Sequence, residues 1–196
     1  MEELTVGKIA VHEFITIDGV FEDPSFTFDY PFDPKMGVAI ARIMGSSKAI
    51  LLGRRTHEMF APAWSVRTAA DDPGAPFMNE SPKYVVSGSL KNADYWNNST
   101  VIGAYSADSI RRIKDQVDGN IYVSGRGTLV RAMLADGLVD ELELFVFPVA
   151  IGKGARLFNE KASAIRFALV STEAYNSGVV HLSYRTAGSS AGLSGP

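Results

Sequence analysis

Residues 120–149, NIYVSGRGTLVRAMLADGLVDELELFVFPV, place a strand, a glycine-rich turn, a helix and a second strand in immediate succession. The two runs "NIYVSG" and "ELELFVFPV" are rich in β-branched and aromatic residues, which is typical of buried strands. The segment "GTLVRAMLADG" between them predicts a helix closed by Gly137. Two strands joined by a crossover helix pair in parallel. This stretch therefore predicts a parallel α/β sheet.

The rest of the chain continues the alternation of strands and helices. Further strands are predicted at 8–17, 49–53 and 83–87, and helices at 35–45, from 56 onward and at 106–117. The runs 165–175 and 179–185 flank a short turn and predict a terminal β-hairpin. Two proline-rich segments, 20–34 and 61–82, are expected to be irregular loops. The order predicts a mainly parallel sheet with helices on both faces and an antiparallel hairpin at one edge.

Composition limits the class of protein. The 196 residues fit one domain, which we expect over 1–186, followed by a flexible Gly/Ser-rich tail at 187–196. A formal charge of −3 provides no cationic excess for nucleic acid, and no apolar run approaches the roughly 18 residues of a membrane span. The absence of cysteine excludes disulfides and thiolate sites, and the acidic start does not resemble a signal peptide. We therefore expect a cytoplasmic protein without nucleic-acid or membrane partners.

Unusual residues follow three of the predicted strands: Gly53-Arg54-Arg55-Thr56, Ser87-Gly88-Ser89 and Ser124-Gly125-Arg126-Gly127-Thr128. Because parallel strands end at the same edge of a sheet, we expect the three turns to meet there. Glycines allow close backbone approach, helix N-termini offer free N–H groups, and arginine binds phosphate oxygens in pairs. Singly, each turn could equally be a capped turn with a solvated cation. Together they predict a dinucleotide site, and the additional arginine favours NADP over NAD.

Aromatic residues offer a second kind of site. The loop after the first strand contains several of them, among them Phe21 and Phe28, and Trp64 lies in the second long loop. These rings could stack on a flat substrate or could equally pack their loops onto the domain or onto a partner subunit. The candidates for a proton donor are Asp18, Asp29 and Tyr30, with ordered water an equal alternative. The histidines His12, His57 and His181 lack metal-ligand spacing, so we expect core or surface roles for them and no metal site.

Several motifs together resemble the dihydrofolate-reductase-like superfamily, in the branch of the C-terminal reductase domain of bacterial riboflavin-biosynthesis deaminase/reductases. The matching stretches are "ITIDGVFEDP" (15–24), "LLGRRTHEMF" (51–60), "KYVVSGSL" (83–90) and 122–158, and the resemblance extends over about 7–186. It implies a three-layer αβα sandwich around a mixed, mainly parallel sheet, with an NADPH site.

The resemblance also implies residue roles. Gly53, Arg54, Arg55 and Thr56 would bind the 2′-phosphate and pyrophosphate, with Ser87 beside the adenosine phosphate. The turn Gly125, Arg126, Gly127, Thr128 and Leu129 would hold the pyrophosphate, although Arg126 departs from the small residue common there. The nicotinamide would face the backbone of Phe14 and Ile15 and the turn from Asp18 to Phe21.

One departure limits the substrate. Dihydrofolate reductases have an acid in the first helix, but residues 35–47 contain none, so folate reduction is not expected. We therefore predict an NADPH-dependent reductase of a small heterocyclic or carbonyl substrate, which resembles 5-amino-6-(5-phosphoribosylamino)uracil reductases. The substrate contacts would be Asp18, Phe21, Phe28 and Trp64. The alternative is a non-catalytic module of the same fold that binds NADP(H) or another small ligand. Exposed aromatics and the hairpin also predict a homodimer.

Overall fold

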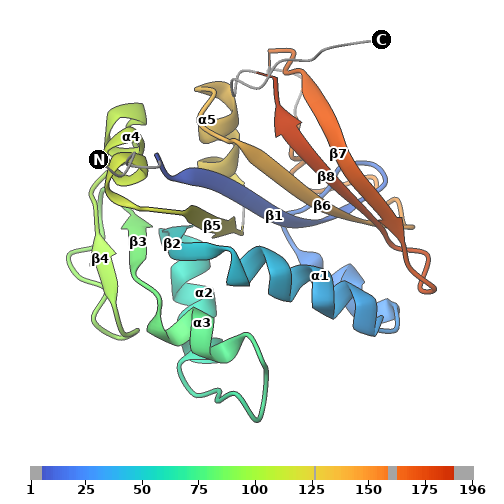
Figure 1. Cartoon of the computed structure of the whole chain (residues 1–196), viewed down its shortest axis with the longest axis horizontal. Helices are drawn as coiled ribbons and strands as arrows, with labels where there is room; N and C mark the ends of the chain where they lie inside the picture. The colour runs from blue at the N-terminus through green and yellow to red at the C-terminus, as the bar shows by residue number, and fades with distance from the viewer. Residues whose placement is uncertain (1–5, 126, 159–162, 188–196) are drawn as a thin grey trace, which may run out of the picture.

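The computed structural model describes residues 6–125, 127–158 and 163–187. Eight strands form one sheet in the order β4-β3-β2-β5-β1-β6-β8-β7 (Figure 1). The strands are β1 (Lys8–Thr16), β2 (Ser47–Gly53), β3 (Lys83–Val86), β4 (Ser99–Val101), β5 (Asn120–Ser124), β6 (Glu141–Phe147), β7 (Phe167–Ala174) and β8 (Val180–Thr186). The first six strands of this order, from β4 across to β6, pair in parallel. Strand β8 pairs antiparallel with β6, and β7 pairs antiparallel with β8. The prediction of a mixed, mainly parallel sheet with a terminal hairpin is confirmed.

Helices cover both faces of the sheet. They are α1 (Pro34–Gly45), α2 (Arg54–Trp64), α3 (Ala75–Glu80), α4 (Ala107–Gln116) and α5 (Thr128–Ala135), with a 3-10 helix η1 at Pro24–Asp29. In Figure 1, α4 and α5 lie above the sheet and α1, α2 and α3 below it. The result is the expected three-layer sandwich.

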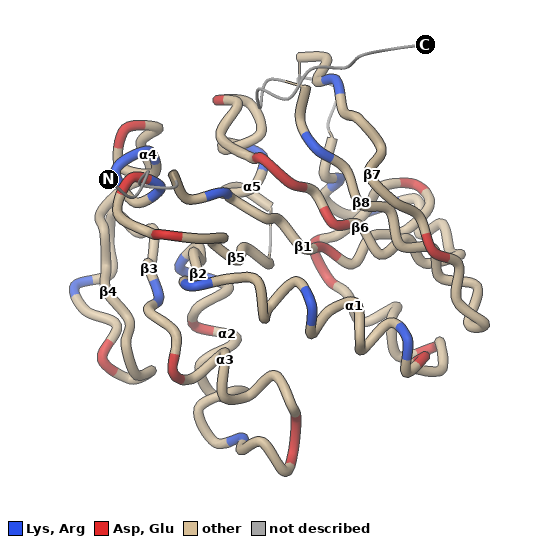
Figure 2. The backbone as a smooth tube through the Cα atoms, viewed as in Figure 1, with Lys and Arg blue, Asp and Glu red and all other residues tan. Residues whose placement is uncertain are grey.

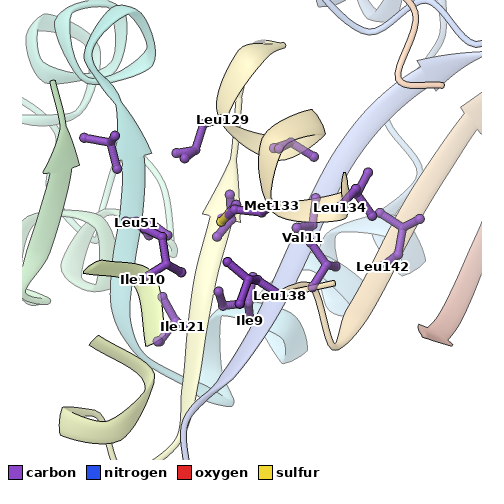
Figure 3. Close-up of a cluster of buried hydrophobic side chains, with 14 of the residues drawn as sticks. Ile9, Val11, Leu51, Ile110, Ile121, Leu129, Met133, Leu134, Leu138 and Leu142 are labelled. Carbon is purple, nitrogen blue, oxygen red and sulfur yellow. The ribbon is translucent and has the colours of Figure 1, made fainter. Parts of the chain in front are cut away.

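Strand side chains alternate between two cores because both faces of the sheet are covered. On the face of α4 and α5, Ile9, Val11 and Ile121 pack against Ile110 and Met133 (Figure 3). The other face packs against α1, α2 and α3, and its buried residues include the following aromatic side chains: Phe26, Trp96, Tyr122, Phe145, Phe147 and Tyr175. One face of the sheet is thus mainly aliphatic, whereas the other carries many aromatic rings.

The helix ends follow the sequence signals. The Ser106 side chain accepts a hydrogen bond from the backbone N–H of Ser109 and so caps α4, as its position predicted. After α5, Gly137 has φ +65, which closes that helix as predicted. The Asp33 side chain caps α1 by accepting from the N–H of Lys35.

Three short elements were not predicted. The segment 61–82 was expected to be one loop, but α2 continues through Pro62 to Trp64, and α3 forms at Ala75–Glu80. Pro62 lies in the last turn of α2, so it removes a single helical hydrogen bond instead of breaking the middle of the helix. The 3-10 helix η1 likewise lies in the loop expected at 20–34, and the three-residue edge strand β4 is too short to give a pattern.

Charged residues are interspersed along the described chain and not separated onto two faces (Figure 2). None of the described helices is long and apolar enough to cross a bilayer. The predicted tail lies outside the described residues except for Ala187, whose N–H bonds the Arg166 carbonyl.

Candidate functional site

Residues from all three predicted turns line one cavity of about 560 Å³, called here the arginine cavity. Its lining includes Gly53, Arg54, Arg55, Thr56, Ser87, Gly88, Ser89, Gly127, Thr128, Leu129 and Arg131. The topology explains the convergence, because β2 lies between β3 and β5 and all three strands end at the same edge. The expected meeting of the turns is therefore observed.

Two helix N-termini open into the arginine cavity. Helix α2 begins after Gly53 and α5 begins after Gly127, and neither of these N-cap positions provides a side-chain cap. Gly127 has φ +67, a left-handed conformation that favours glycine. Because the first amides of a helix have no intrahelical partner, both ends present N–H donors and a partial positive charge. These donors suit the oxygens of a phosphate or pyrophosphate group.

The arginines of this cavity differ in their surroundings. Arg54 donates from Nε to Glu58 at 2.6 Å and from a terminal nitrogen to Ser89 at 2.8 Å. The Glu58 carboxylate raises the pKa of the Arg54 guanidinium. Arg131, which the sequence did not single out, donates to the Arg156 carbonyl at 3.1 Å. Arg55 is exposed and has no ion pair within the described part of the chain.

Thr56 and Gly125 bring two of the turns into contact. Thr56 is buried, and a Cβ added to Gly125, which has φ +127, would collide with the Thr56 side chain. The N–H of Gly125 donates to the buried carboxyl of Glu13 at 3.1 Å. Burial raises the pKa of Glu13 well above its ordinary value. Glu13 therefore positions the glycine-rich turn through this hydrogen bond, a role that the sequence analysis did not identify.

Other predicted cofactor residues have mainly structural surroundings. The Ser87 hydroxyl oxygen accepts from the N–H groups of Ser89 and Leu90 and so shapes its own turn. The side chains of Ile15 and Leu129 are buried in the aliphatic core, although Leu129 also lines the arginine cavity. Arg126 lies outside the described residues.

A second cavity, of about 580 Å³, is lined by residues of α1, α2 and α3 and of the sheet, and is called here the aromatic cavity. Its lining includes the predicted residues Phe14 and Trp64 and, from other elements, His12, Phe32, Val38, Ile40, Met44, Phe60, Asp72, Met78, Tyr122 and Ser124. Strand β5 connects the two cavities, since Ser124 lines the aromatic cavity and Gly127 and Thr128 just beyond it line the arginine cavity.

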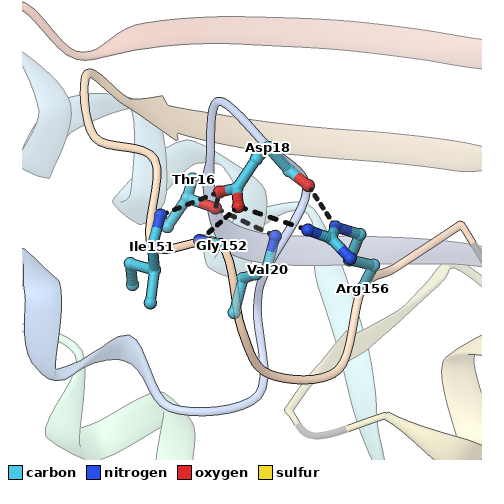
Figure 4. Close-up of polar contacts among 6 residues, drawn as sticks. All are labelled: Thr16, Asp18, Val20, Ile151, Gly152 and Arg156. Atoms are coloured by element: carbon cyan, nitrogen blue, oxygen red, sulfur yellow. Dashed lines mark hydrogen bonds and ion pairs between the residues drawn. The ribbon is translucent and has the colours of Figure 1, made fainter.

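Asp18 has a structural role and lines neither cavity. Its carboxylate accepts from the Thr16 hydroxyl at 2.6 Å, the Gly152 N–H at 2.7 Å and the Ile151 N–H at 3.2 Å. Figure 4 shows these contacts together with Arg156, which donates to the Asp18 carbonyl. The hydrogen bonds from Thr16 and Gly152 lower the pKa of Asp18 to about 2. An acid held ionised in this way is poorly suited to donate a proton, and it instead ties the turn after β1 to the segment after β6.

The remaining candidates are not brought into either cavity. Phe21 is 2% exposed and belongs to the aliphatic core, whereas Phe28 is 88% exposed. Tyr30 donates to the Pro148 carbonyl at 3.2 Å, and Asp29 is exposed. The loop rings thus pack or face outward, and of the four predicted substrate residues Trp64 alone lines the aromatic cavity.

His12 and Tyr122 are lining residues that the sequence did not assign to a site. His12 Nδ1 and the Tyr122 hydroxyl are 2.7 Å apart. A polar residue in phase with Phe14 along an apolar strand was the available signal, but the pairing of β1 with β5 was needed to bring Tyr122 beside it. His57 bonds Tyr95 and Ser99, and His181 bonds Glu143. The described residues contain no group of three side chains able to hold a metal ion.

Comparison with known families gives the identity of the fold. The model of the RibD C-terminal domain matches residues 7–181. The chain belongs to this family. The uncharacterized protein YyaP of Bacillus subtilis (strain 168) is 26% identical in an alignment of 183 positions that covers 90% of this chain and 94% of YyaP.

Two solved structures confirm the dihydrofolate-reductase-like fold. A Shewanella sp. PV-4 protein assigned by name to riboflavin biosynthesis is similar with a TM-score of 0.75 at 18% identity, over 91% of this chain and 98% of that one. Dihydrofolate reductase from Enterococcus faecalis, complexed with NADP(H) and RAB-propyl, has a TM-score of 0.59 at 16% identity, over 93% and 98%. The likeness to both extends over nearly the whole chain, so the expected fold is confirmed.

Proposed function

We propose that this RibD C-terminal domain protein is an NADPH-dependent reductase of a small heterocyclic or carbonyl compound. The observation that carries the proposal is the pairing of two uncapped helix N-termini with Arg55 at the arginine cavity. The aromatic cavity across the same strand ends supports it, because a reductase needs a place for the substrate next to the cofactor.

The arginine cavity would hold the phosphates. The free amides at the starts of α2 and α5 would bind the pyrophosphate, and Arg55 would bind the 2′-phosphate with a charge-assisted hydrogen bond. Arg54 would contribute less, since Glu58 already balances its charge. NADPH, when bound, supplies a hydride, so reduction of a carbonyl group requires in addition one proton at oxygen. Because Asp18 is held ionised, we assign that proton to solvent.

A non-catalytic module that binds NADP(H) is the second candidate. The observation that favours it is the scarcity of acids at the aromatic cavity, where Asp72 is the carboxylate among the described lining residues. The two candidates share the cofactor site and differ in turnover. Oxidation of NADPH in the presence of a panel of pterins, flavins and carbonyl compounds separates them, and tight binding without oxidation would support the module.

Calorimetric titration of the purified protein with NADPH and with NADH tests the cofactor site. We expect tighter binding of NADPH, and we expect Arg55→Ala to weaken NADPH by about 1–3 kcal/mol while leaving NADH nearly unchanged. Arg54→Ala should have a smaller effect on NADPH. Arg112→Ala removes an exposed arginine of α4 that lines neither cavity, and serves as the matched control. Equal weakening of both cofactors by Arg55→Ala would place this arginine away from the 2′-phosphate, and failure to bind either cofactor would overturn the proposal.

A further inference from the structure

The walls of the aromatic cavity suit a flat, apolar molecule. Rings from two elements and one loop line it, namely Phe14 on β1, Phe60 and Trp64 on α2 and Phe32 just before α1. Aliphatic and methionine side chains of α1 and α3 fill the spaces between these rings. Aromatic walls favour a planar ligand because rings stack and pack edge to face.

The cavity provides no cation for an anionic group. None of its described lining residues is a lysine or an arginine, and its one charged lining residue is Asp72. Arg67, outside the lining, lies 5.0 Å from the Trp64 ring centroid and 3.9 Å from the Asp72 carboxylate, which balances its charge. A phosphate placed here would lose its hydration without gaining a charged partner. The aromatic cavity therefore selects against phosphorylated ligands, in contrast to the arginine cavity.

The polar end of the cavity is a histidine with one unused nitrogen. His12 is 3% exposed, and its Nδ1 lies 2.7 Å from the Tyr122 hydroxyl. Its Nε2 is buried and has no hydrogen-bond partner in the part of the chain that the structure describes. An unpartnered buried nitrogen is costly, and a ligand atom that reached Nε2 from the cavity would supply its missing hydrogen bond.

The state of His12 follows from its neighbours. Burial, with a smaller effect of His181, lowers the pKa of His12 to about 4, so the imidazole is neutral at pH 7. Glu143, which would favour the charged form, is already bonded to His181 at 2.7 Å and Ser183 at 2.8 Å. In one of the two tautomers of His12, the Tyr122 hydroxyl donates to His12 Nδ1. The imidazole proton then lies on Nε2, which becomes a neutral donor.

We propose that the aromatic cavity takes an uncharged, flat carbonyl compound without a phosphate group, and that His12 Nε2–H donates a hydrogen bond to its carbonyl oxygen. A neutral imidazole donor polarises a carbonyl without requiring a charge in an apolar site. Tyr122 is a positioning residue that acts through His12. The inference deepens the proposed function by naming the substrate class, and it separates this chain from reductases of phosphoribosyl compounds.

Binding of three matched probes without NADPH tests the inference and keeps it distinct from the cofactor proposal. The probes are menadione, 1,4-naphthoquinone-2-sulfonate and 2-methylnaphthalene, which share one ring system and differ in charge or in carbonyl oxygens. Quenching of tryptophan fluorescence reports binding, because Trp64, one of the two tryptophans, lines the cavity, and the chain has no cysteine that could form quinone adducts. We expect menadione to bind at least about tenfold more tightly than the sulfonate and roughly fivefold more tightly than 2-methylnaphthalene.

Two variants assign the carbonyl contact. His12→Phe should abolish the preference for menadione over 2-methylnaphthalene. Its melting temperature is measured alongside, because the change removes both the unpartnered Nε2 and the buried hydrogen bond between Nδ1 and the Tyr122 hydroxyl. Tyr122→Phe should reduce the same preference about twofold, because it removes the hydroxyl that pairs with His12 Nδ1 and orients the ring. Equal binding of menadione and the sulfonate, no binding of menadione, or a preference that survives in His12→Phe would each overturn the inference. None of these outcomes depends on whether NADPH binds.

Discussion

The two cavities have nearly the same volume, about 560 and 580 Å³, but opposite chemistry. The arginine cavity is built from turns, helix N-termini and cations, whereas the aromatic cavity is built from side-chain rings around one neutral histidine. Strand β5 and the turn that follows it form the boundary between them. Under the proposed function, one sheet edge would hold a charged cofactor and an uncharged ligand side by side, because each group would lose its hydration only where the cavity supplies suitable partners.

Substitution of Gly125, in the turn between the two cavities, should have the largest effect on stability. Gly125→Ala would force a side chain into a left-handed backbone and against Thr56. We expect the free energy of unfolding to fall by roughly 2–5 kcal/mol, from the combined costs of strain and overpacking. Urea denaturation measures this loss. Binding of NADPH should weaken as well, since the turn carries the start of α5.

Gly45→Ala is the control for this substitution. Gly45 ends α1, and a Cβ added there would meet no atom within 4 Å. Alanine should therefore change stability by at most about 1 kcal/mol, toward a more stable protein. Equal effects of the two substitutions would mean that Gly125 is not constrained by its contact with Thr56.

Asp18 tests whether a polar cluster outside both cavities acts on stability alone. Its folded pKa of about 2 lies below the ordinary value of 3.8, so its contribution to stability is present above about pH 4 and is lost as the pH falls toward 2. Asp18→Asn should lower the melting temperature at pH 7 and flatten the loss of stability between pH 4 and 2. Calorimetric melting at several pH values measures both effects.

The binding sites should be indifferent to that change. NADPH and menadione should each bind Asp18→Asn with unchanged affinity, because Asp18 lines neither cavity. Asp29→Asn, in the loop that follows, replaces an exposed carboxylate and should alter neither stability nor binding. A loss of NADPH oxidation in Asp18→Asn at unchanged stability would restore Asp18 as a candidate proton donor.

The sheet and the arginine cavity could be predicted because their signals are local. Each strand, its following turn and its helix are contiguous, and the parallel topology alone brings the three turns together. The ion pair between Arg54 and Glu58 could also have been predicted from the sequence, since residues four apart lie on the same face of a helix. Because Glu58 balances the charge of Arg54, Arg55 is the one of these two arginines whose charge is not paired within the described residues.

The aromatic cavity could not be predicted because its walls come from many elements. Placing His12 next to Tyr122 requires the register in which His12 faces Ser124 across β1 and β5. The prediction of substrate contacts in the aromatic-rich loop 20–34 failed for a related reason. Its rings have the chemistry of a binding site, but whether a ring such as Phe21 is buried in the core or faces a ligand depends on tertiary packing. Short elements such as β4 likewise depend on the strand beside them.

The smallest expected effect concerns the charge balance of the arginine cavity. Arg54 and Glu58 are both about half exposed, with side-chain exposures of 47% and 40%, so their ion pair contributes little to stability. Glu58→Gln should nevertheless release the charge of Arg54 toward the cavity and tighten NADPH binding about two- to fivefold at low salt. The gain should shrink in 0.5 M salt, where screening is roughly twice as effective as at physiological ionic strength. It should also vanish in the double variant Glu58→Gln with Arg54→Ala. A gain that persists without Arg54 would show that Glu58 acts on the bound phosphates directly, and the distinction between the two arginines would then have to be abandoned.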